Sequence, residues 1–303
     1  MNKLEKPQSK HFELQRDDVN YPEILALRDT FPRTIYGVGR EDALGQGVAI
    51  IGARNASTYG KRIAKMIASW AADLGLVVYS GGARGCDQAA HGGALEAGGS
   101  TVAVMGCGAN IVYPSSAGGL LNEISQTGAI ISEFTWGSPP MKYRFRQRNR
   151  LIAALSDLVI VVEARLPSGT LSTVHHALEL GVPVAAVPGS IFCLESAAPN
   201  RLIAEGAFPI CCREDLALAC NFSAGRLDVA SLCKGSKSNF ESEEKSDAGK
   251  IYSALAACSQ FPDDLAQDLN LALAEVLEVL SHLEVQGNVV RLIDGRYAHS
   301  GGG

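Results

Sequence analysis

The segment that decides the fold is GVAIIGARNASTYG at residues 47–60, where an apolar strand leads through a glycine-bearing turn into a helix. LVVYSGGARGCD at residues 76–87 repeats the same succession. Similar patterns predict further strands at 101–106, 129–132, 158–163 and 182–188, and helices at 60–74, 87–97, 148–156 and 170–180. Strands that alternate with helices at this rhythm indicate βαβ crossovers. We therefore predict an α/β core with a doubly wound parallel sheet.

The composition agrees with a large buried core. The chain has 303 residues, of which 47% are hydrophobic and only 6% aromatic. This length predicts about two domains. No uninterrupted apolar stretch is long enough to span a membrane, and the polar residues 1–18 lack the apolar centre of a signal peptide, which predicts a cytoplasmic protein. The eight cysteines form no CxxC pair and have no closely spaced histidine partner, so we expect no metal site.

The C-terminal part of the chain reads as a separate small domain. Residues 221–246 are small, polar and charged with both signs, as in a linker. Three helices are then expected at 249–259, 262–269 and 271–286, followed by strands at 288–292 and 296–299 around an Asp294-Gly295 turn. This is the winged-helix order. The predicted organisation is an N-terminal extension (1–46), a core (47–220), a linker (221–246) and a winged-helix domain (247–300).

The predicted winged helix is acidic. From residue 246 to the end there are three cationic and eight anionic residues, a net charge of −5. Its third helix carries Glu275, Glu278 and Glu284 and no lysine or arginine, so DNA phosphates would be repelled. We interpret this domain as a protein-interaction module. A transcription regulator that reads duplex DNA through it is the less favoured alternative.

The run KYRFRQRNR at residues 142–150 has the opposite character. Five of its nine residues are cationic and two are aromatic, although the whole chain has a net charge of −5. Clustered cations attract a polyanion, and interleaved rings offer faces on which nucleobases stack. The run indicates a nucleic-acid contact, although arginine-rich runs also occur as solvated helix starts.

The two glycine-bearing turns each deliver an arginine, Arg54 or Arg84, and the second turn contains Ser80, Gly81 and Gly82. The carboxyl ends of parallel strands meet at one edge of the sheet, where helix-start amides and arginines together bind phosphate. The chain contains no GxGxxG fingerprint and no P-loop, so we expect neither a dinucleotide cofactor nor nucleotide hydrolysis.

No catalytic residue is identified in the sequence. His91 lies in an apolar helical stretch, and no GxSxG elbow is present. Glu133 and Glu163 follow two predicted strands. They are either carboxylates at the rim of a pocket or structural groups that accept hydrogen bonds from helix-start amides or pair with arginine.

The motifs GARNASTYG, SGGARGCDQAAH, KYRFRQRNRLIAALS and SGTLSTVHHALELG occur in an order and spacing that resemble the DNA-processing protein A (DprA or Smf) family. The similarity runs from about residue 21 to 215, and the winged helix fits as well. The resemblance implies a Rossmann-like core and a non-enzymatic recombination mediator of competence and DNA-mediated transformation. Such a protein binds single-stranded DNA without sequence preference, protects incoming strands, loads the RecA recombinase onto them, and acts as a homodimer without a cofactor.

The resemblance also assigns residues. It implies that Arg54 contacts phosphate, that Lys142 contacts DNA, that Phe145 stacks on a base, and that Arg84 lies beside the same pocket. The full set of expected DNA-binding residues is Arg54, Ser80, Gly81, Gly82, Arg84, Lys142, Phe145, Arg148, Asn149 and Arg150. The last three begin the next predicted helix, so they either touch DNA or serve the architecture of the pocket. The chain departs from the family pattern at Arg146, where proline is usual. The alternative is a nucleotide-processing enzyme of the lysine-decarboxylase-like Rossmann group, but residues 167–173 lack the double glycine and the glutamate of that group's motif.

Overall fold

The structure, a computed structural model, describes residues 10–223, 247–257, 259–286, 288–292 and 294–299. The chain divides into two compact units, one within residues 1–227 and the other within 228–303. No helix among the described residues is long and apolar enough to cross a membrane.

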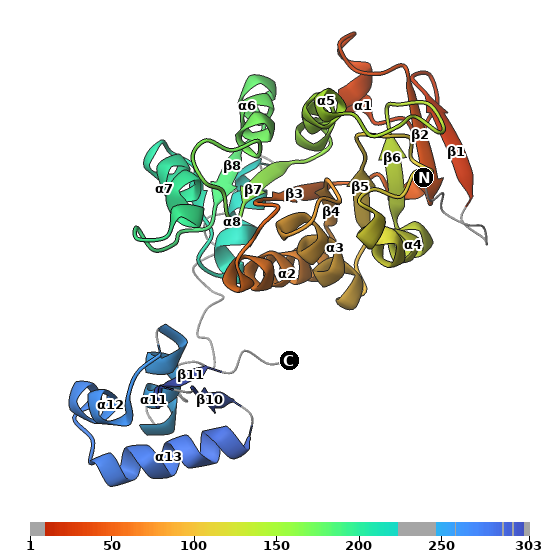
Figure 1. The fold of residues 1–303 in the computed structure, drawn as a ribbon. Helices are drawn as coiled ribbons and strands as arrows, with labels where there is room; N and C mark the ends of the chain where they lie inside the picture. The colour runs from red at the N-terminus through yellow and green to blue at the C-terminus, as the bar shows by residue number, and fades with distance from the viewer. Residues whose placement is uncertain (1–9, 224–246, 258, 287, 293, 300–303) are drawn as a thin grey trace. The chain divides into compact units, whose positions relative to one another are not determined.

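The first unit is built on one sheet (Figure 1). Among its described residues, nine strands lie in the order β1-β2-β6-β5-β4-β3-β7-β8-β9. From β6 to β9 neighbouring strands are parallel, whereas β1 and β2 join the edge antiparallel. The strands are β1 (His11–Gln15), β2 (Thr34–Gly39), β3 (Gly47–Ile51), β4 (Val77–Ser80), β5 (Thr101–Val104), β6 (Ala129–Ser132), β7 (Leu158–Val161), β8 (Val184–Ala186) and β9 (Phe208–Pro209). The six strands predicted from apolar runs correspond to β3 through β8.

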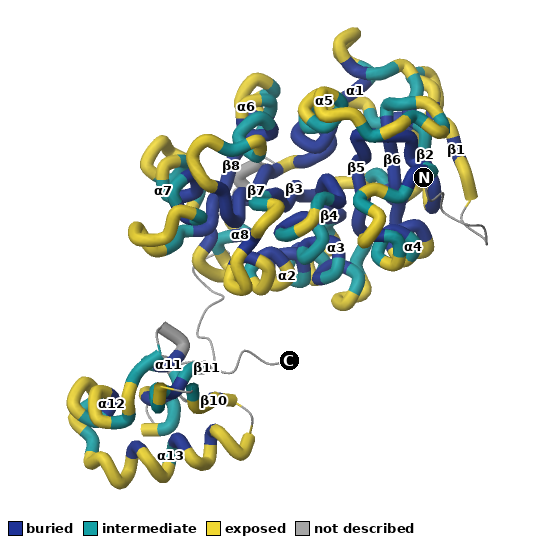
Figure 2. The backbone as a smooth tube through the Cα atoms, in the orientation of Figure 1, coloured by how far each residue is buried: buried dark blue, intermediate teal, exposed yellow. Residues whose placement is uncertain are grey.

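Helices cover both faces of this sheet. They are α1 (Glu23–Ala26), α2 (Thr58–Asp73), α3 (Cys86–Glu96), α4 (Gly118–Thr127), α5 (Lys142–Ala154), α6 (Leu171–Leu180), α7 (Ala197–Ala204) and α8 (Arg213–Ser223). In Figure 1, α2, α3 and α4 lie below the sheet, and α5 and α6 lie above it. From β3 to β8 every strand position is buried, because both faces of the sheet are covered. Along β3, Val48 and Ile50 pack with α2 and α3, while Ala49 and Ile51 pack on the face of α5 and α6. Figure 2 shows the resulting buried centre.

Residues 11–39 of the predicted N-terminal extension belong to the core sheet. His11–Gln15 pairs antiparallel with β2, and β2 pairs antiparallel with β6. In β1 buried and exposed residues alternate, so Phe12 and Leu14 enter the core. Gly37 makes room for this packing, because a Cβ at that position would lie 2.1 Å from the Phe12 ring. The core therefore begins well before residue 47.

The strand order places a crevice at the end of β3. The chain builds β4, β5 and β6 outward on one side of β3, and then continues with β7 and β8 on the other side. Ligands of open α/β sheets bind at such a reversal, outside the carboxyl ends of the strands. A ligand site is therefore expected at the loops that follow β3 and β7.

The second unit has the predicted winged-helix order. It contains α11 (Asp247–Ala257), α12 (Pro262–Leu269), α13 (Leu273–Val285), β10 (Val289–Arg291) and β11 (Tyr297–His299). Its core includes Ile251, Leu265, Val276 and Leu280. Of the predicted linker, residues 221–223 complete α8, and residues 224–246 lie outside the described residues.

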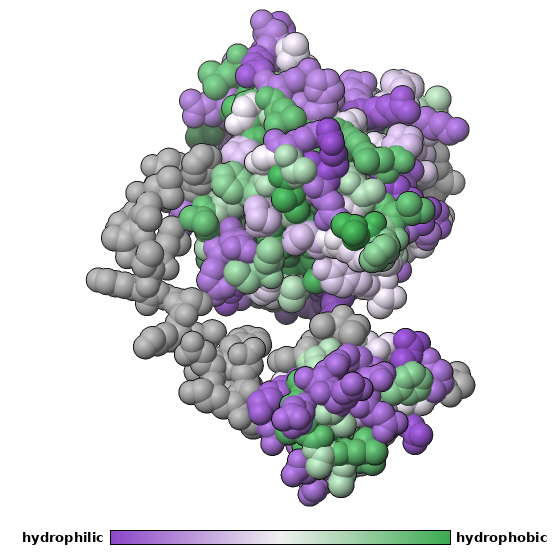
Figure 3. Space-filling view, turned by 90° about the vertical axis from the view of Figure 1, so that its left-hand side faces the viewer, coloured by the Kyte–Doolittle hydropathy of each residue, from purple (hydrophilic) through white to green (hydrophobic). Residues whose placement is uncertain are grey.

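Exposed apolar side chains gather in the segment between β8 and α7. Ile191, Phe192 and Leu194 are 84%, 91% and 66% exposed. Figure 3 views the molecule from the side of α7 and shows hydrophobic patches among hydrophilic ones on the first unit.

Candidate nucleic-acid interface

A hollow of about 480 Å³ opens at the carboxyl ends of β3 and β4, beside α5. We call it the Phe145 hollow. Four loops and helix α5 supply most of its walls: the turn after β3, the turn after β4, the loop after β5 and the loop before α6. It is lined by Ile51, Gly52, Ala53, Arg54, Ala83, Asp87, Tyr113, Lys142, Phe145, Arg146, Arg148, Asn149, Ile152, Ser168, Gly169, Thr170 and Thr173. The strand order therefore predicts its place correctly.

The cationic run is helical from its first residue. We expected a helix from residue 148, but α5 begins at Lys142. Residues three and four apart share a helix face. Lys142, Phe145, Arg146 and Asn149 follow this spacing, and all four line the Phe145 hollow. The helix thus presents an aromatic ring among cations to the hollow.

The Phe145 ring lies near another ring and a guanidinium group. The Tyr113 ring centroid is 5.1 Å from that of Phe145, at an interplanar angle of 35°. Arg54 belongs to the turn after β3, and its Cζ atom lies 5.8 Å from the centroid of the Phe145 ring. Phe145 is half-buried, so part of its surface is accessible in the hollow. A base that stacks here would find cations within reach of its phosphates.

The exposed cations of the hollow are unpaired within the described part of the chain. Arg54, Lys142 and Arg146 are exposed, and no described carboxylate lies within 4.0 Å of their charged nitrogens. Some cations elsewhere in the described residues do form ion pairs, as Lys65 does with Glu96. Unpaired cations around a hollow create a local positive potential, and phosphate is the anion that matches arginine geometry.

Arg148 is not a free cation. It is 4% exposed, and its Nη1 donates to the carbonyl oxygens of Gly81 (2.9 Å) and Val104. Burial lowers the pKa of the guanidinium to about 10, against the opposing effect of nearby Asp87, so the group is charged at neutral pH. Arg148 therefore ties α5 to the carboxyl ends of β4 and β5. Of the two roles left open for Arg148, these contacts favour the architecture of the pocket, while a DNA contact of its remaining surface stays a prediction.

The turn after β4 is held from both sides. A Cβ on Gly81 would lie 2.6 Å from Arg148 Nη2 and 2.7 Å from Asp87 Oδ2, so only glycine fits. The backbone N–H of Gly81 donates to Asp87 at 3.2 Å. Burial raises the pKa of Asp87 to about 6, which Arg148 and the backbone donors oppose. Gly82 is buried, and its carbonyl oxygen accepts from the Gln88 amide at 3.3 Å.

The other expected DNA-binding residues separate into two groups. Ser80 is fully buried, and its hydroxyl donates to the Ile50 carbonyl at 2.6 Å, so its side chain does not face the hollow. Arg84 is exposed on the same turn as Ala83, which lines the hollow. Asn149 lines the hollow and donates to Ser172 Oγ at 2.7 Å.

Arg150 points away from the hollow. Its guanidinium donates to the Thr30 carbonyl at 2.8 Å and forms an ion pair with Glu133, and it lies over the Phe31 ring at 5.3 Å. Arg150 therefore fastens the segment before β2 to the end of β6. The structure does not bring it together with Arg54 and Lys142.

The carboxylates and the histidine considered above have structural partners. Glu163 accepts hydrogen bonds from the backbone N–H and the hydroxyl of Ser57, which itself caps α2. This confirms for Glu163 the interpretation as an acceptor at a helix start. His91 is fully buried, and burial lowers its pKa to about 3. Within the described residues, no three His, Cys, Asp or Glu side chains gather as metal ligands.

The hollow is also lined by residues outside the expected DNA-binding set, among them Tyr113, Arg146, Ser168 and Thr170. Arg146 has a helical signal, because it lies four residues after Lys142 in α5. Tyr113, Ser168 and Thr170 come from loops, where no periodic pattern marks the residues that converge.

Comparison with known proteins agrees with this geometry. The chain matches the family model of DNA recombination-mediator protein A over residues 13–221 and the DprA winged helix domain over residues 238–295. A DprA protein of Mycobacterium tuberculosis is 36% identical over 253 residues, which cover 83% of this chain and 64% of that protein. Protein Smf of Escherichia coli is 39% identical over 206 residues, covering 67% and 54%. The chain thus spans just over half to just under two thirds of these relatives.

Two solved structures share the fold. DprA of Streptococcus pneumoniae superposes with a TM-score of 0.65 at 36% identity, covering 69% of this chain and 74% of that one. DNA processing protein A of Helicobacter pylori, described for its single-stranded DNA binding mode, gives a TM-score of 0.63 at 30% identity, covering 74% and 97%. The mostly parallel sheet, the winged helix and these matches together show that this chain belongs to the DNA recombination-mediator protein A (DprA) family.

Proposed function

We propose that this protein binds single-stranded DNA in the Phe145 hollow without sequence preference. The observation that carries the proposal is the set of exposed, unpaired cations Arg54, Lys142 and Arg146 around the accessible Phe145 ring. Cations contact the phosphate of every nucleotide, and every base has a face that stacks on a ring. Neither contact reads the edge of a base, so the interaction is independent of sequence. The single-stranded DNA binding described for the Helicobacter pylori protein supports the same ligand.

The test is fluorescence anisotropy with a labelled single strand and the same sequence as a duplex. The variant Phe145→Ala is expected to weaken single-strand binding by about 1–3 kcal/mol, the usual value of one stacked base. Phe192→Ala is the matched control, because Phe192 is 91% exposed and does not line the hollow. Equal affinity of the Phe145→Ala variant and the parent protein would contradict the proposal. Release of free base from nucleoside monophosphates would instead favour the nucleotide-processing enzyme.

We further propose that the bound strand is protected in the cytoplasm and handed to the RecA recombinase during transformation, with the protein acting as a homodimer. Family membership supports this role. The winged helix is proposed to bind protein rather than DNA, because α13 carries Glu275, Glu278 and Glu284.

The assembly is tested by light scattering, where the mass of a single chain would exclude the homodimer. Recombinase capture is tested by comparing the whole chain with a chain that ends at residue 246. Loss of RecA capture on removal of the winged helix would assign the contact to that domain, and unchanged capture would assign it elsewhere.

A further inference from the structure

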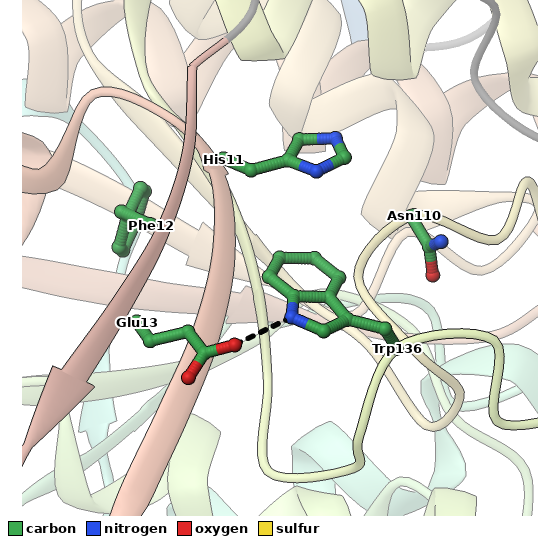
Figure 4. A pocket seen from close by; sticks show the side chains of 5 residues that line it. All are labelled: His11, Phe12, Glu13, Asn110 and Trp136. Atoms are coloured by element: carbon green, nitrogen blue, oxygen red, sulfur yellow. Dashed lines mark hydrogen bonds between the residues drawn. The ribbon is translucent and has the colours of Figure 1, made fainter.

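A second hollow, of about 350 Å³, lies at the β1 edge of the sheet (Figure 4). It is lined by His11, Phe12, Glu13, Asn110 and Trp136, and we call it the Trp136 hollow. The β1 strand, the loop after β5 and the loop before α5 supply these residues. None of them belongs to the expected DNA-binding set.

The Trp136 hollow contains a fixed aromatic surface. The rings of His11 and Trp136 stack at a centroid distance of 4.9 Å and an interplanar angle of 14°, and Tyr36 meets the indole edge-on at 5.4 Å. The indole Nε1 donates to Glu13 at 2.7 Å, as the dashed line in Figure 4 shows. The polar atom of Trp136 is therefore satisfied within the protein. Its ring surface is what the hollow offers to a ligand.

The Trp136 hollow and the Phe145 hollow share two loops. The loop after β5 supplies Asn110 to one hollow and Tyr113 to the other, and the loop before α5 supplies Trp136 and Lys142 in the same way. The loops are also bonded to each other. Gly137 donates to Asn110 Oδ1, and Gly108 donates to the Ser138 carbonyl, both at 2.9 Å.

Chain geometry limits the separation of the two hollows. The three residues from Asn110 to Tyr113 span at most about 11 Å, and the six from Trp136 to Lys142 at most about 21 Å. One strand in duplex geometry advances about 3.4 Å for each nucleotide. About six nucleotides therefore suffice to reach from Lys142, which lines the Phe145 hollow, to Trp136. Tyr143, whose ring is exposed, and Arg144 follow Lys142 in the first turn of α5, at the end of the helix that follows the loop containing Trp136.

The charge of the Trp136 hollow selects a base rather than a phosphate. Glu13 is exposed at its wall, and a carboxylate repels a phosphate group at close range. A neutral base can stack on the rings and donate an amino hydrogen to a carboxylate. The two hollows are thus complementary, with cations at one and stacked rings beside a carboxylate at the other.

We propose that the stacked His11–Trp136 rings bind a second unpaired base of the same DNA strand that occupies the Phe145 hollow. The inference rests on the proposed function and extends the DNA contact along the β1 edge of the sheet. It makes affinity depend on strand length, because a short strand reaches only one of the two hollows.

The fluorescence of Trp136 tests this contact directly. The chain has two tryptophans, and Trp70→Phe leaves Trp136 as the only indole without altering either hollow. In the Trp70→Phe variant a twelve-nucleotide oligo-dT is expected to quench the fluorescence of Trp136, because a base stacked on the indole quenches its emission by direct contact. A four-nucleotide oligo-dT is expected to bind with much less quenching.

Affinity provides the second measurement. Trp136→Ala is expected to bind the twelve-nucleotide strand at least fivefold more weakly than Trp136→Phe, which keeps a stacking ring, while the two variants bind the four-nucleotide strand equally. Three results would each overturn the inference. They are the absence of quenching at saturation, equal affinity of the two variants for the long strand, and quenching by inorganic phosphate alone. If the predictions for Trp136 fail while Phe145→Ala still weakens single-strand binding, the inference is wrong and the proposed function stands. No binding of either strand by the parent protein would overturn both.

Discussion

Removal of the unpaired cations gives the sharpest prediction about the Phe145 hollow. The affinity for a single strand falls with salt, with a slope of about −0.7 in logarithmic units for each phosphate neutralised. Three contacts, from Arg54, Lys142 and Arg146, give a slope of about −2.1. The double change Arg54→Ala with Lys142→Ala leaves one contact and a slope of about −0.7. Between 50 and 200 mM salt the parent protein then loses affinity about twentyfold, and the variant about threefold.

The assay is a salt titration of anisotropy with a labelled oligo-dT. The matched control is Lys65→Ala with Arg213→Ala, which removes the same charge from residues that pair with Glu96 and Asp73 and do not line the hollow. The control is expected to keep the parent slope. A parent-like slope in the Arg54 and Lys142 variant, or an equally reduced slope in the control, would show that these cations do not contact phosphate.

Two further predictions concern residues that the structure assigns to the scaffold. Burial keeps His91 neutral in the folded protein and lowers its pKa to about 3. Because the histidine of the unfolded chain takes up a proton near pH 6.5, the folded state loses stability as the pH falls from about 6.5 toward 3. The difference in unfolding free energy between the parent and His91→Gln, measured in urea, should therefore shrink by about 2 kcal/mol from pH 7.5 to pH 5.0, and a constant difference would refute it. Arg150→Ala leaves the largely buried Glu133 without its cation, which should cost about 2 kcal/mol of stability and leave the salt slope of DNA binding unchanged. A reduced slope would place Arg150 at the DNA.

The strands of the core could be predicted from the sequence because two covered faces demand continuous apolar runs. The N-terminal strands are different, since β1 alternates His-Phe-Glu-Leu-Gln and half of its side chains are exposed. Apolar and polar residues do alternate in this segment, as in a half-buried strand. An alternation over only five residues among charged neighbours is too short to distinguish an edge strand from a polar extension. β1 pairs with β2, and β2 pairs in turn with β6, whose residues lie ninety or more positions further along the chain, so this pairing appears only in the fold.

The start of α5 escaped prediction for a related reason. Met141 is its N-cap residue and makes no side-chain cap, and the first turns are strongly polar. Neither a capping motif nor an apolar stripe marks the start, so the helix is stabilised by tertiary contacts of Leu151 and its neighbours with the sheet.

Within the candidate site, the glycine turns and the cationic run were found from residue type alone, but the division of labour was not. Arginine is rarely buried, so a sequence favours exposure for Arg148 as for Arg146. The carbonyl oxygens that receive Arg148 belong to Gly81 and Val104, which are distant in sequence. Which cation of the run is internal therefore becomes visible only when the sheet is assembled.

The buried Arg148 also determines how the protein meets a flexible strand. Its guanidinium joins the helix that carries Phe145 to the turn after β4, and a charge in this position cannot withdraw without losing both carbonyl partners. The stacking ring and the backbone turn therefore keep their spacing before any ligand arrives. Most of the conformational entropy lost on capture belongs to the DNA, so strands that are already extended should associate with the smallest entropic cost.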